Sequence, residues 1–350
     1  MARRIGFSHL TVILVFSVGA TMATAEPDTK LQFSNQHYVD DAEIAKRDRT
    51  KPFYFHMLDR KDGSKSNPPA FTVDKGTSFN VWLDKQVPHS ASKLGNARSL
   101  AIQITADHDE NVKDKIFLDA VPHWSNQKML VNGGPRYISF DFMLDPHYEL
   151  PTAWAIHLQA WQCCGGHPPF AMSITPSKDK NGPAELFFGF RDDLLEHQKG
   201  SPAKTIYNMN LARGEWNNFV LQLDPETDAS AQPGVLAMWL NGKPQFCFKA
   251  HWGFDPGRVG DDGHKITNAM GVDIGVYRRR QATTQTVYFD NIRSGATFEA
   301  VSNYPVGAPL QCQSIEQPAA GRAQPSDGLE PERDTGNPRG IIVSERYFSL

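Results

Sequence analysis

Residues 154–162 read W-A-I-H-L-Q-A-W-Q and carry three side chains suited to binding or cleaving a sugar. Side chains alternate between the two faces of an extended strand, so His157, Gln159 and Trp161 are expected to share one face. An imidazole, a carboxamide and an indole on one face supply a proton acceptor, a hydrogen-bond donor and a stacking surface. The same pattern also fits a half-buried strand whose histidine is satisfied by hydrogen bonds. Motifs elsewhere in the chain must therefore decide between the two readings.

Short β-type runs separated by turn signals dominate the chain that surrounds this stretch. One run, Y-I-S-F-D-F-M-L, places Ile138, Phe140, Phe142 and Leu144 on one face, and Asn241-Gly242 is a strong type I′ hairpin signal. Many short strands with regular turns predict an all-β jelly-roll sandwich of two antiparallel sheets. The runs lie at residues 78–83, 100–105, 137–144, 154–161, 170–175, 184–190, 216–223, 235–240, 272–279 and 286–292.

The two ends of the chain differ in composition from its centre. Residues 1–25 are predicted to be a signal peptide, because Arg3-Arg4 precede an apolar stretch and Ala23-Thr24-Ala25 forms an A-x-A cleavage signal. The apolar stretch is short for a membrane span, so the mature chain is expected to be secreted or periplasmic without membrane insertion. Residues 26–312 are the predicted jelly-roll domain. Residues 313–350, rich in Pro and Gly, are a predicted disordered tail.

The charge balance argues against a nucleic-acid partner. The chain has 36 Lys and Arg against 39 Asp and Glu, a formal charge of -3. Removal of residues 1–25 takes away two arginines and no acid, which makes the mature chain more acidic. The local exception is Arg278-Arg279-Arg280, a triplet that fits either an anionic ligand or a solvated surface. We expect a monomer whose binding partner is a carbohydrate.

Four cysteines fit an oxidising compartment and are disulfide candidates. Cys163 and Cys164 are adjacent, and adjacent cysteines rarely pair with each other because the geometry strains the bond. One of them is a candidate partner for Cys247 or Cys312, and the sequence leaves the connectivity open.

Four later stretches, taken in order, resemble β-jelly-roll polysaccharide lyases of the heparin lyase I and glucuronan lyase type, and alginate lyases of the same architecture are similar. They are W-N-N-F-V at 216–220, G-V-L-A-M-W-L-N-G-K at 234–243, D-I-G-V-Y-R at 273–278 and V-Y-F-D-N-I at 287–292. Upstream, H-L-Q at 157–159 with Pro168-Pro169 looks like the family's Q-x-H strand and following P-P, and Arg98-Ser99-Leu100 resembles its R-S-E-L. The resemblance covers roughly residues 95–300 and implies a concanavalin A-like fold with a concave substrate groove.

The resemblance also implies a reaction, the cleavage of a uronic-acid polysaccharide by β-elimination. The C5 proton of a uronate is acidic because it lies α to a carboxylate, whose developing charge Gln159 and Arg98 are expected to neutralise. His157 is the expected base. Tyr277 is the expected acid, or both base and acid in a syn elimination, with Arg279 on the same strand face in support. No cofactor is required.

Tryptophans and oxygen-rich segments complete the list of candidate sites. Trp161, Trp124 and Trp252 are predicted sugar contacts, whereas Trp82, Trp216 and Trp239 fit core positions in strands. Relatives of this type sometimes hold a structural calcium, for which the chain offers Asp290 and residues 260–263, G-D-D-G. No catalytic metal site is predicted.

The chain departs from the resembled pattern at three places. His157 and Gln159 stand in the reverse order, Asp273 replaces a lysine, and R-S-E-L lacks its glutamate. A non-catalytic, lectin-like jelly roll is therefore the alternative. A glycoside hydrolase on the same sandwich is a further alternative, and it requires two carboxylates that face each other across the scissile bond.

Overall fold

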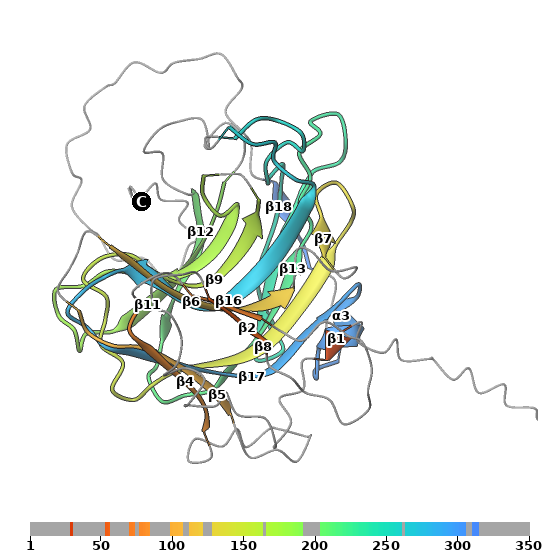
Figure 1. Ribbon diagram of the computed structural model, residues 1–350. Coiled ribbons are helices and arrows are strands. Elements are labelled where there is room, and N and C mark those ends of the chain that lie inside the picture. Colours follow the sequence, from red (N-terminus) through yellow and green to blue (C-terminus); the bar gives the residue numbers. More distant parts are fainter. Residues whose placement is uncertain are drawn as a thin grey trace, which may run out of the picture.

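Two nine-stranded β-sheets pack face to face in the computed structural model (Figure 1). The structure describes residues 29–30, 53–56, 70–73, 77–84, 99–107, 112–121, 128–163, 166–191, 204–260, 263–305 and 310–314, and the structural statements below refer to these residues. All pairs of labelled strands are antiparallel except β15 with β18. The predicted all-β sandwich of two antiparallel sheets is confirmed.

The first sheet has the order β18-β15-β14-β13-β8-β17-β5-β4, with β1 beside β17. Its strands are β18 (Gln313–Ser314), β15 (Lys243–Ala250), β14 (Gly234–Leu240), β13 (Asn217–Leu223), β8 (Arg136–Leu144), β17 (Gln285–Gly295), β5 (Ser99–Ile104), β4 (Phe79–Asp84) and β1 (Thr29–Lys30). One short helix, α3 (Phe298–Val301), follows β17 and packs on this sheet.

The second sheet has the order β12-β11-β10-β9-β16-β6-β3-β2, with β7 beside β16. Its strands are β12 (Lys204–Leu211), β11 (Ala184–Phe190), β10 (Phe170–Ile174), β9 (Ala155–Gln162), β16 (Ala269–Arg279), β6 (Lys113–Val121), β3 (Ala70–Val73), β2 (Phe53–His56) and β7 (Met129–Leu130). All of the W-A-I-H-L-Q-A-W-Q stretch except its first tryptophan forms β9 at the centre of this sheet, directly beside β16.

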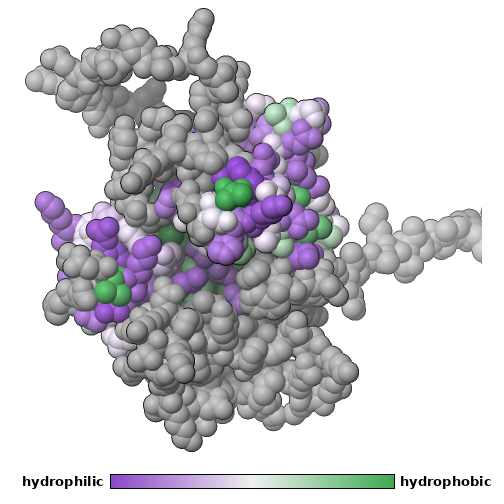
Figure 2. All heavy atoms as spheres, turned by 45° about the horizontal axis from the view of Figure 1, so that its top comes forward, coloured by the Kyte–Doolittle hydropathy of each residue, from purple (hydrophilic) through white to green (hydrophobic). Residues whose placement is uncertain are grey.

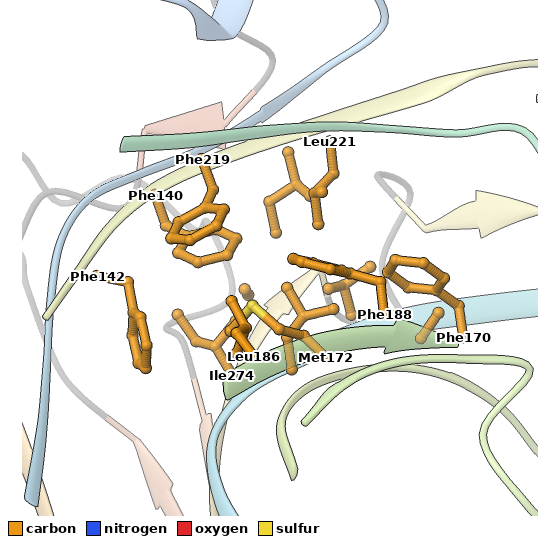
Figure 3. Close-up of a cluster of buried hydrophobic side chains, with 14 of the residues drawn as sticks. Phe140, Phe142, Phe170, Met172, Leu186, Phe188, Phe219, Leu221 and Ile274 are labelled. Carbon is orange, nitrogen blue, oxygen red and sulfur yellow. The ribbon is translucent and has the colours of Figure 1, made fainter. Parts of the chain in front are cut away.

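Aromatic side chains fill the space between the two sheets (Figure 3). The four residues of β8 that alternate in the sequence, Ile138 to Leu144, all lie in this core as predicted. The rings of Phe140 and Phe219 stack with centroids 5.4 Å apart. Each fully buried ring of this size stabilises the fold by about 2–3 kcal/mol. This core fixes the two sheets and leaves the other face of each sheet available for function.

The predicted type I′ hairpin is confirmed at Asn241-Gly242. Both residues have positive φ, 50° and 76°, and the flanking Leu240 and Lys243 pair directly across β14 and β15. Asparagine and glycine tolerate this left-handed backbone better than other residues.

A disulfide joins Cys247 on β15 to Cys312, with Cα atoms 4.4 Å apart. The parallel pairing of β18 with β15 brings these two cysteines together. Cys163 is a half-buried free thiol, so the expectation that it might bond Cys247 or Cys312 is wrong. Cys164 lies outside the described residues.

Hydrophilic residues make up most of the described surface that Figure 2 shows, with a few scattered hydrophobic ones. The large hydrophobic side chains exposed among the described residues are Leu130, Val259 and Tyr304. In the part of the chain that the structure describes, no helix is long and apolar enough to cross a membrane. Residues 1–25 and 315–350, the predicted signal peptide and most of the predicted tail, lie outside that part.

Candidate active site

A β-bulge in β9 turns His157 away from the predicted site. Along the pairing with β10, Leu158 lies opposite Met172 and Ile156 lies opposite Ser173, so His157 is an extra residue on β9. An extra residue breaks the strict alternation of side chains. His157 therefore points into the core with Leu158, and the prediction that it shares a face with Gln159 and Trp161 is wrong.

The His157 side chain is fully buried, with 0% of its surface exposed. Its Nδ1–H donates to the carbonyl of Gly275 at 2.9 Å, and its Nε2 accepts from the Tyr148 hydroxyl at 2.8 Å. Its ring also packs against Phe142. Burial lowers the pKa of His157 to about 4. A neutral imidazole with both nitrogens occupied has a structural role, so the predicted role of base is wrong.

Replacement of His157 by alanine is expected to lower the free energy of unfolding by about 3 kcal/mol, because it opens a cavity and leaves the Tyr148 hydroxyl unpaired. The folded pKa of His157 lies below its unfolded value, so its contribution is present above about pH 6.5 and is lost as the pH falls toward about 4. Urea unfolding of wild type and His157→Ala at several pH values measures both effects. The exposed His147→Ala is the control, and equal stability of the two variants would contradict the assignment.

The face of the second sheet that points away from the core, here called the outer face, carries the remaining candidate residues. Leu158 and Ala160 lie in the core, so Gln159 and Trp161 project from β9 onto the outer face. Gln159 is buried there, and its Nε2 donates to Asp273 on β16 at 3.0 Å. Trp161 is half-buried. The structure thus keeps two of the three predicted β9 residues together.

A pair of carboxyl groups lies next to Gln159 on the outer face. Asp273 on β16 is directly opposite Asp119 on β6, and both side chains are buried. Burial and the charge of Asp273 raise the pKa of Asp119 to about 9, so Asp119 carries a proton at neutral pH. Among the described residues, Asp119 Oδ2 and Gln159 Oε1 have no hydrogen-bond partner. Sequence reasoning missed Asp119, whose partner lies far away in the chain.

The raised pKa of Asp119 predicts a pH dependence of stability. The folded value, about 9, lies above the unfolded value of 3.8, so the contribution is present at low pH and is lost as the pH rises through about 9. Between pH 6 and pH 8, wild type is expected to lose about 2 kcal/mol more than Asp119→Asn, which cannot titrate. Urea unfolding at both pH values tests this, with the exposed Asp255→Asn as control. Parallel curves for wild type and Asp119→Asn would rule out the raised pKa of Asp119.

Tyr277 on β16 is the most accessible titratable aromatic side chain of this group. It is half-buried, and its ring meets Trp154 edge-to-face at 4.9 Å and Phe117 at 6.0 Å. The ammonium groups of Lys115 and Lys113 lie 5.6 and 5.9 Å from the centre of the ring. Because Val276 lies in the core, Tyr277 projects from the face opposite to His157. A joint acid–base role for His157 and Tyr277 is therefore excluded.

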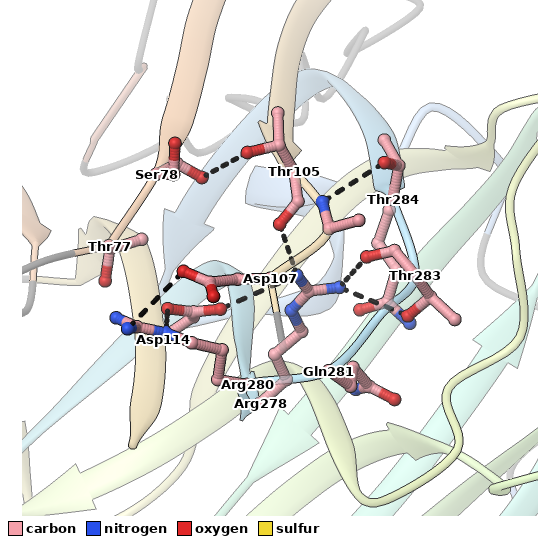
Figure 4. Close-up of polar contacts among 12 residues, drawn as sticks. Thr77, Ser78, Thr105, Asp107, Asp114, Arg278, Arg280, Gln281, Thr283 and Thr284 are labelled. Carbon is pink, nitrogen blue, oxygen red and sulfur yellow. Dashed lines mark hydrogen bonds and ion pairs between the residues drawn. The ribbon is translucent and has the colours of Figure 1, made fainter. Parts of the chain in front are cut away.

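The arginine triplet that follows Tyr277 is divided between the two faces. Arg278 is fully buried and lies 3.5 Å from Asp114, and Arg280 Nε donates to Asp114 at 2.9 Å (Figure 4). Arg279 is exposed and lies on the same side of β16 as Tyr277. The triplet is thus neither an anion site nor a solvated run, and only Arg279 remains available to a ligand.

The other predicted sugar contacts have different outcomes. Trp252 is fully buried in the core, where its Nε1 donates to the carbonyl of Asp224 at 2.8 Å, so its predicted place at the rim of the groove is wrong. Trp161 keeps its place on the outer face as a predicted contact. Arg98 and Trp124 lie outside the described residues.

The predicted calcium ligand Asp290 lies next to Asp141 in the first sheet. The Asp141 carboxylate already accepts hydrogen bonds from Asn218 at 2.6 Å and Asn291 at 2.5 Å. Burial raises the pKa of Asp290 to about 7. The described residues contain no group of three or more His, Cys, Asp or Glu that would hold a metal ion. Two carboxylates do not supply the 6–8 oxygens that calcium takes. Asp261 and Asp262 lie outside the described residues, and structural calcium stays a prediction.

A family model described as polysaccharide lyase matches residues 78–293, a segment that includes β6, β9 and β16. Among solved structures, the endo-β-1,4-glucuronan lyase from the fungus Trichoderma reesei is 16% identical with a TM-score of 0.49, and the match covers 71% of this chain and 97% of that one. The PL7 alginate lyase AlyA1 from Zobellia galactanivorans is 11% identical with a TM-score of 0.40, covering 71% and 95%. No curated protein sequence matches this chain.

Proposed function

The chain belongs to the polysaccharide lyase family and is a polysaccharide lyase; on this premise we propose that it cleaves a uronic-acid-containing polysaccharide by β-elimination on the outer face of the second sheet. The observation that carries the proposal is the position of Tyr277. It combines a half-buried phenol, two neighbouring ammonium groups and a place on the face that is not occupied by the core. An anionic substrate is attracted to this local positive charge.

In the proposed reaction, Tyr277 acts as both base and acid. Its phenolate oxygen takes the C5 proton, the C4–O bond breaks as the C4=C5 double bond forms, and the same proton passes from the resulting hydroxyl to the departing oxygen, which restores the phenolate. The positive charges of Lys113 and Lys115 favour the phenolate form. The reaction needs no other reactant, because the proton removed is the proton returned.

The substrate carboxylate must be neutralised while its C5 proton leaves. Lys115, whose ammonium group also lies 5.5 Å from the centre of the Phe117 ring, supplies a positive charge on the outer face. The Gln159 amide, whose Nε2 donates to Asp273, adds a second hydrogen on the same nitrogen as a donor. Asp273 therefore has a different effect from the repulsion expected of an isolated carboxylate, because it orients Gln159. Arg98 stays a predicted member of this group.

A single residue that removes and returns the proton works from one side of the sugar ring. The elimination is then syn, and it requires the C5 hydrogen and the C4 oxygen on the same side. Glucuronate and mannuronate residues meet this requirement, whereas galacturonate and guluronate residues carry the two groups on opposite sides. We therefore propose a polymer of glucuronate or mannuronate as the substrate class.

The experiment that tests the function is the ultraviolet absorbance of unsaturated uronate ends. Purified protein is incubated with polyglucuronate, polymannuronate, polyguluronate and polygalacturonate, and absorbance is followed with time. We expect absorbance to rise with the first or second polymer and to stay flat with the other two. No rise with any of the four would overturn the lyase proposal for these substrates. A rise with polygalacturonate or polyguluronate alone would overturn the syn mechanism.

The two alternative functions, a lectin-like protein and a glycoside hydrolase, give different signals in the same assay. A lectin-like protein would bind a polymer without any change in absorbance, and a hydrolase would release reducing ends without absorbance. The geometry disfavours a hydrolase, because the two carboxyls of a hydrolase lie on either side of the scissile bond, whereas Asp119 and Asp273 are directly opposite neighbours on adjacent strands and both are buried.

Replacement of Lys115 by methionine is expected to raise KM for the uronate polymer about tenfold, because a partly buried cation near the carboxylate is lost. The effect on KM should shrink as the salt concentration rises. Steady-state kinetics at two ionic strengths measure it, with the exposed Lys249→Met on the first sheet as control. An unchanged KM in Lys115→Met would remove Lys115 from substrate binding.

The proposed context of the reaction is extracellular or periplasmic. The predicted signal peptide at residues 1–25 would direct export, and the Cys247–Cys312 disulfide is stable in an oxidising compartment. We further propose that residues 26–312 form the catalytic domain as a monomer and that most of residues 313–350 are a tail. Gln313–Ser314, at the start of that segment, pair with β15.

A further inference from the structure

A pocket of about 400 Å³ lies on the outer side of the first sheet, across the sandwich from Tyr277. Its floor contains Trp82 on β4, Gln103 on β5 and Tyr288 on β17, which all project away from the core. The volume falls within the range of about 300–1,000 Å³ that is typical of ligand sites. The pocket is therefore large enough for a sugar unit, and the proposed lyase reaction does not use it.

Aromatic rings gather on this side of the sheet. Trp82 and Trp216 are half-buried and pack against Tyr288, whose ring meets that of Trp216 at 6.5 Å. The Trp82 Nε1 donates to Asp84 at 2.9 Å, which holds the indole in position. The expectation that Trp82 and Trp216 lie in the main core is wrong. Indole and phenol rings with fixed orientation offer apolar surface to the C–H groups of a sugar.

Polar groups in fixed positions surround the aromatic floor. Gln103 Nε2 donates to Thr286 at 2.9 Å, and the Tyr288 hydroxyl donates to Asp145 at 2.8 Å. Glu149 Oε2 accepts from a backbone N–H just before β17 at 2.7 Å. Each carboxylate has room for further donors, because a carboxylate offers about four acceptor positions. Fixed acceptors beside an aromatic floor suit the hydroxyl groups of a sugar.

The charge of the pocket separates it from the outer face of the second sheet. Asp145 and Glu149 line it, and Asp84 is bonded to Trp82. Lys180 lies 3.6 Å from Glu149 and balances one of these charges, and the exposed His147 lies at the edge. The net negative charge here would repel an anionic polymer, whereas it would not repel a neutral sugar. The pocket therefore disfavours the acidic substrate of the second sheet.

We propose that this pocket is a second carbohydrate-binding site, which takes a sugar unit of a neutral glycan. Trp82 and Tyr288 form the stacking floor, and Gln103, Asp145 and Glu149 bind the hydroxyl groups. The site holds the enzyme on a neutral polymer while the opposite sheet acts on the acidic one. The inference is independent of the lyase mechanism, because it uses no residue of the outer face of the second sheet.

Native gel electrophoresis through soluble polysaccharides tests the proposal. Wild type is run in gels that contain hydroxyethylcellulose, arabinoxylan, galactomannan or polyglucosamine. We expect at least one of the three neutral polymers to retard the protein, and the dissociation constant for that polymer to rise about tenfold in Trp82→Ala. No retardation by any neutral polymer would overturn the proposal, as would stronger retardation by the cationic polyglucosamine.

Matched variants separate binding from folding and from catalysis. Gln103→Ala removes a polar contact with little change in packing, so it tests the pocket even if Trp82→Ala fails to fold. Trp239→Ala removes a half-buried tryptophan on the same sheet that packs on Phe298 and lies outside the pocket. We expect Gln103→Ala to weaken retardation several-fold, and Trp239→Ala and Tyr277→Phe to keep it. Equal retardation of Gln103→Ala and wild type would overturn the proposal.

Discussion

Tyr277→Phe is expected to lower kcat on the uronate polymer by at least about 10³-fold while leaving the fold intact. A general base or acid contributes about 10²–10⁴ in rate, and the proposed mechanism gives both steps to this one hydroxyl. The phenyl ring of the variant keeps its contacts with Trp154 and Phe117. KM is expected to change little, because Lys113 and Lys115 remain in place. Steady-state absorbance assays measure kcat and KM, and circular dichroism measures the fold.

The matched control for this prediction is Tyr304→Phe, which removes a hydroxyl from an exposed tyrosine that lies against Gly242, in the hairpin between β14 and β15 of the first sheet. It is expected to keep wild-type kcat. If Tyr277→Phe retains more than about a tenth of wild-type kcat, a different group moves the proton and the mechanism fails. If Tyr277→Phe loses activity through a large rise in KM with kcat unchanged, the hydroxyl binds substrate and does no chemistry.

The alternation of side chains in β9 shows how much of the candidate site can be predicted from the sequence. A period of two placed Gln159 and Trp161 on the same face, and the structure agrees. It failed at His157, because the bulge is set by pairing with two other strands, β10, which follows β9 directly, and β16, which lies far along the chain. A local pattern holds no information on where a neighbouring strand gains or loses a residue. The most chemically suggestive histidine was therefore assigned to the wrong face.

Sequence reasoning also missed a strand, β6, for a related physical reason. The run predicted at 184–190 coincides with β11, whereas β6, K-D-K-I-F-L-D-A-V, was not predicted. Its charged residues suggest solvated surface. In the folded chain, Asp114 bonds to Arg280, 166 residues later, and Asp119 lies opposite Asp273. A charge can be buried when a distant partner of opposite sign neutralises it, as at Asp114, and a carboxyl can be buried when its pKa rises, as at Asp119, and a single strand reveals neither condition. The same distance hid Asp119 from the list of candidate residues.

Arg278→Met is expected to lower the free energy of unfolding by about 3–5 kcal/mol, because removal of one partner from a buried ion pair leaves the other charge uncompensated. Arg278 is fully buried between Asp114 and two backbone carbonyls, those of Thr283 at 2.6 Å and Thr105 at 2.8 Å (Figure 4). Methionine fills a similar volume but donates no hydrogen bond. The carbonyls and one oxygen of Asp114 then lose their partners. Burial already raises the pKa of Asp114, so this carboxyl depends on its two arginines to stay charged.

The neighbouring residue supplies the control for this last prediction. Arg279→Met removes the same charge one position along β16, but Arg279 is exposed, so its effect on stability should stay within about 0.5 kcal/mol. The double variant Asp114→Asn/Arg278→Met should recover part of the loss, because the uncompensated carboxylate is gone. Urea unfolding of the three variants measures these differences. Equal stability of Arg278→Met and Arg279→Met would show that the buried ion pair does not hold β16 in place. Other contacts of β16 would then have to fix the position of Tyr277 on that strand.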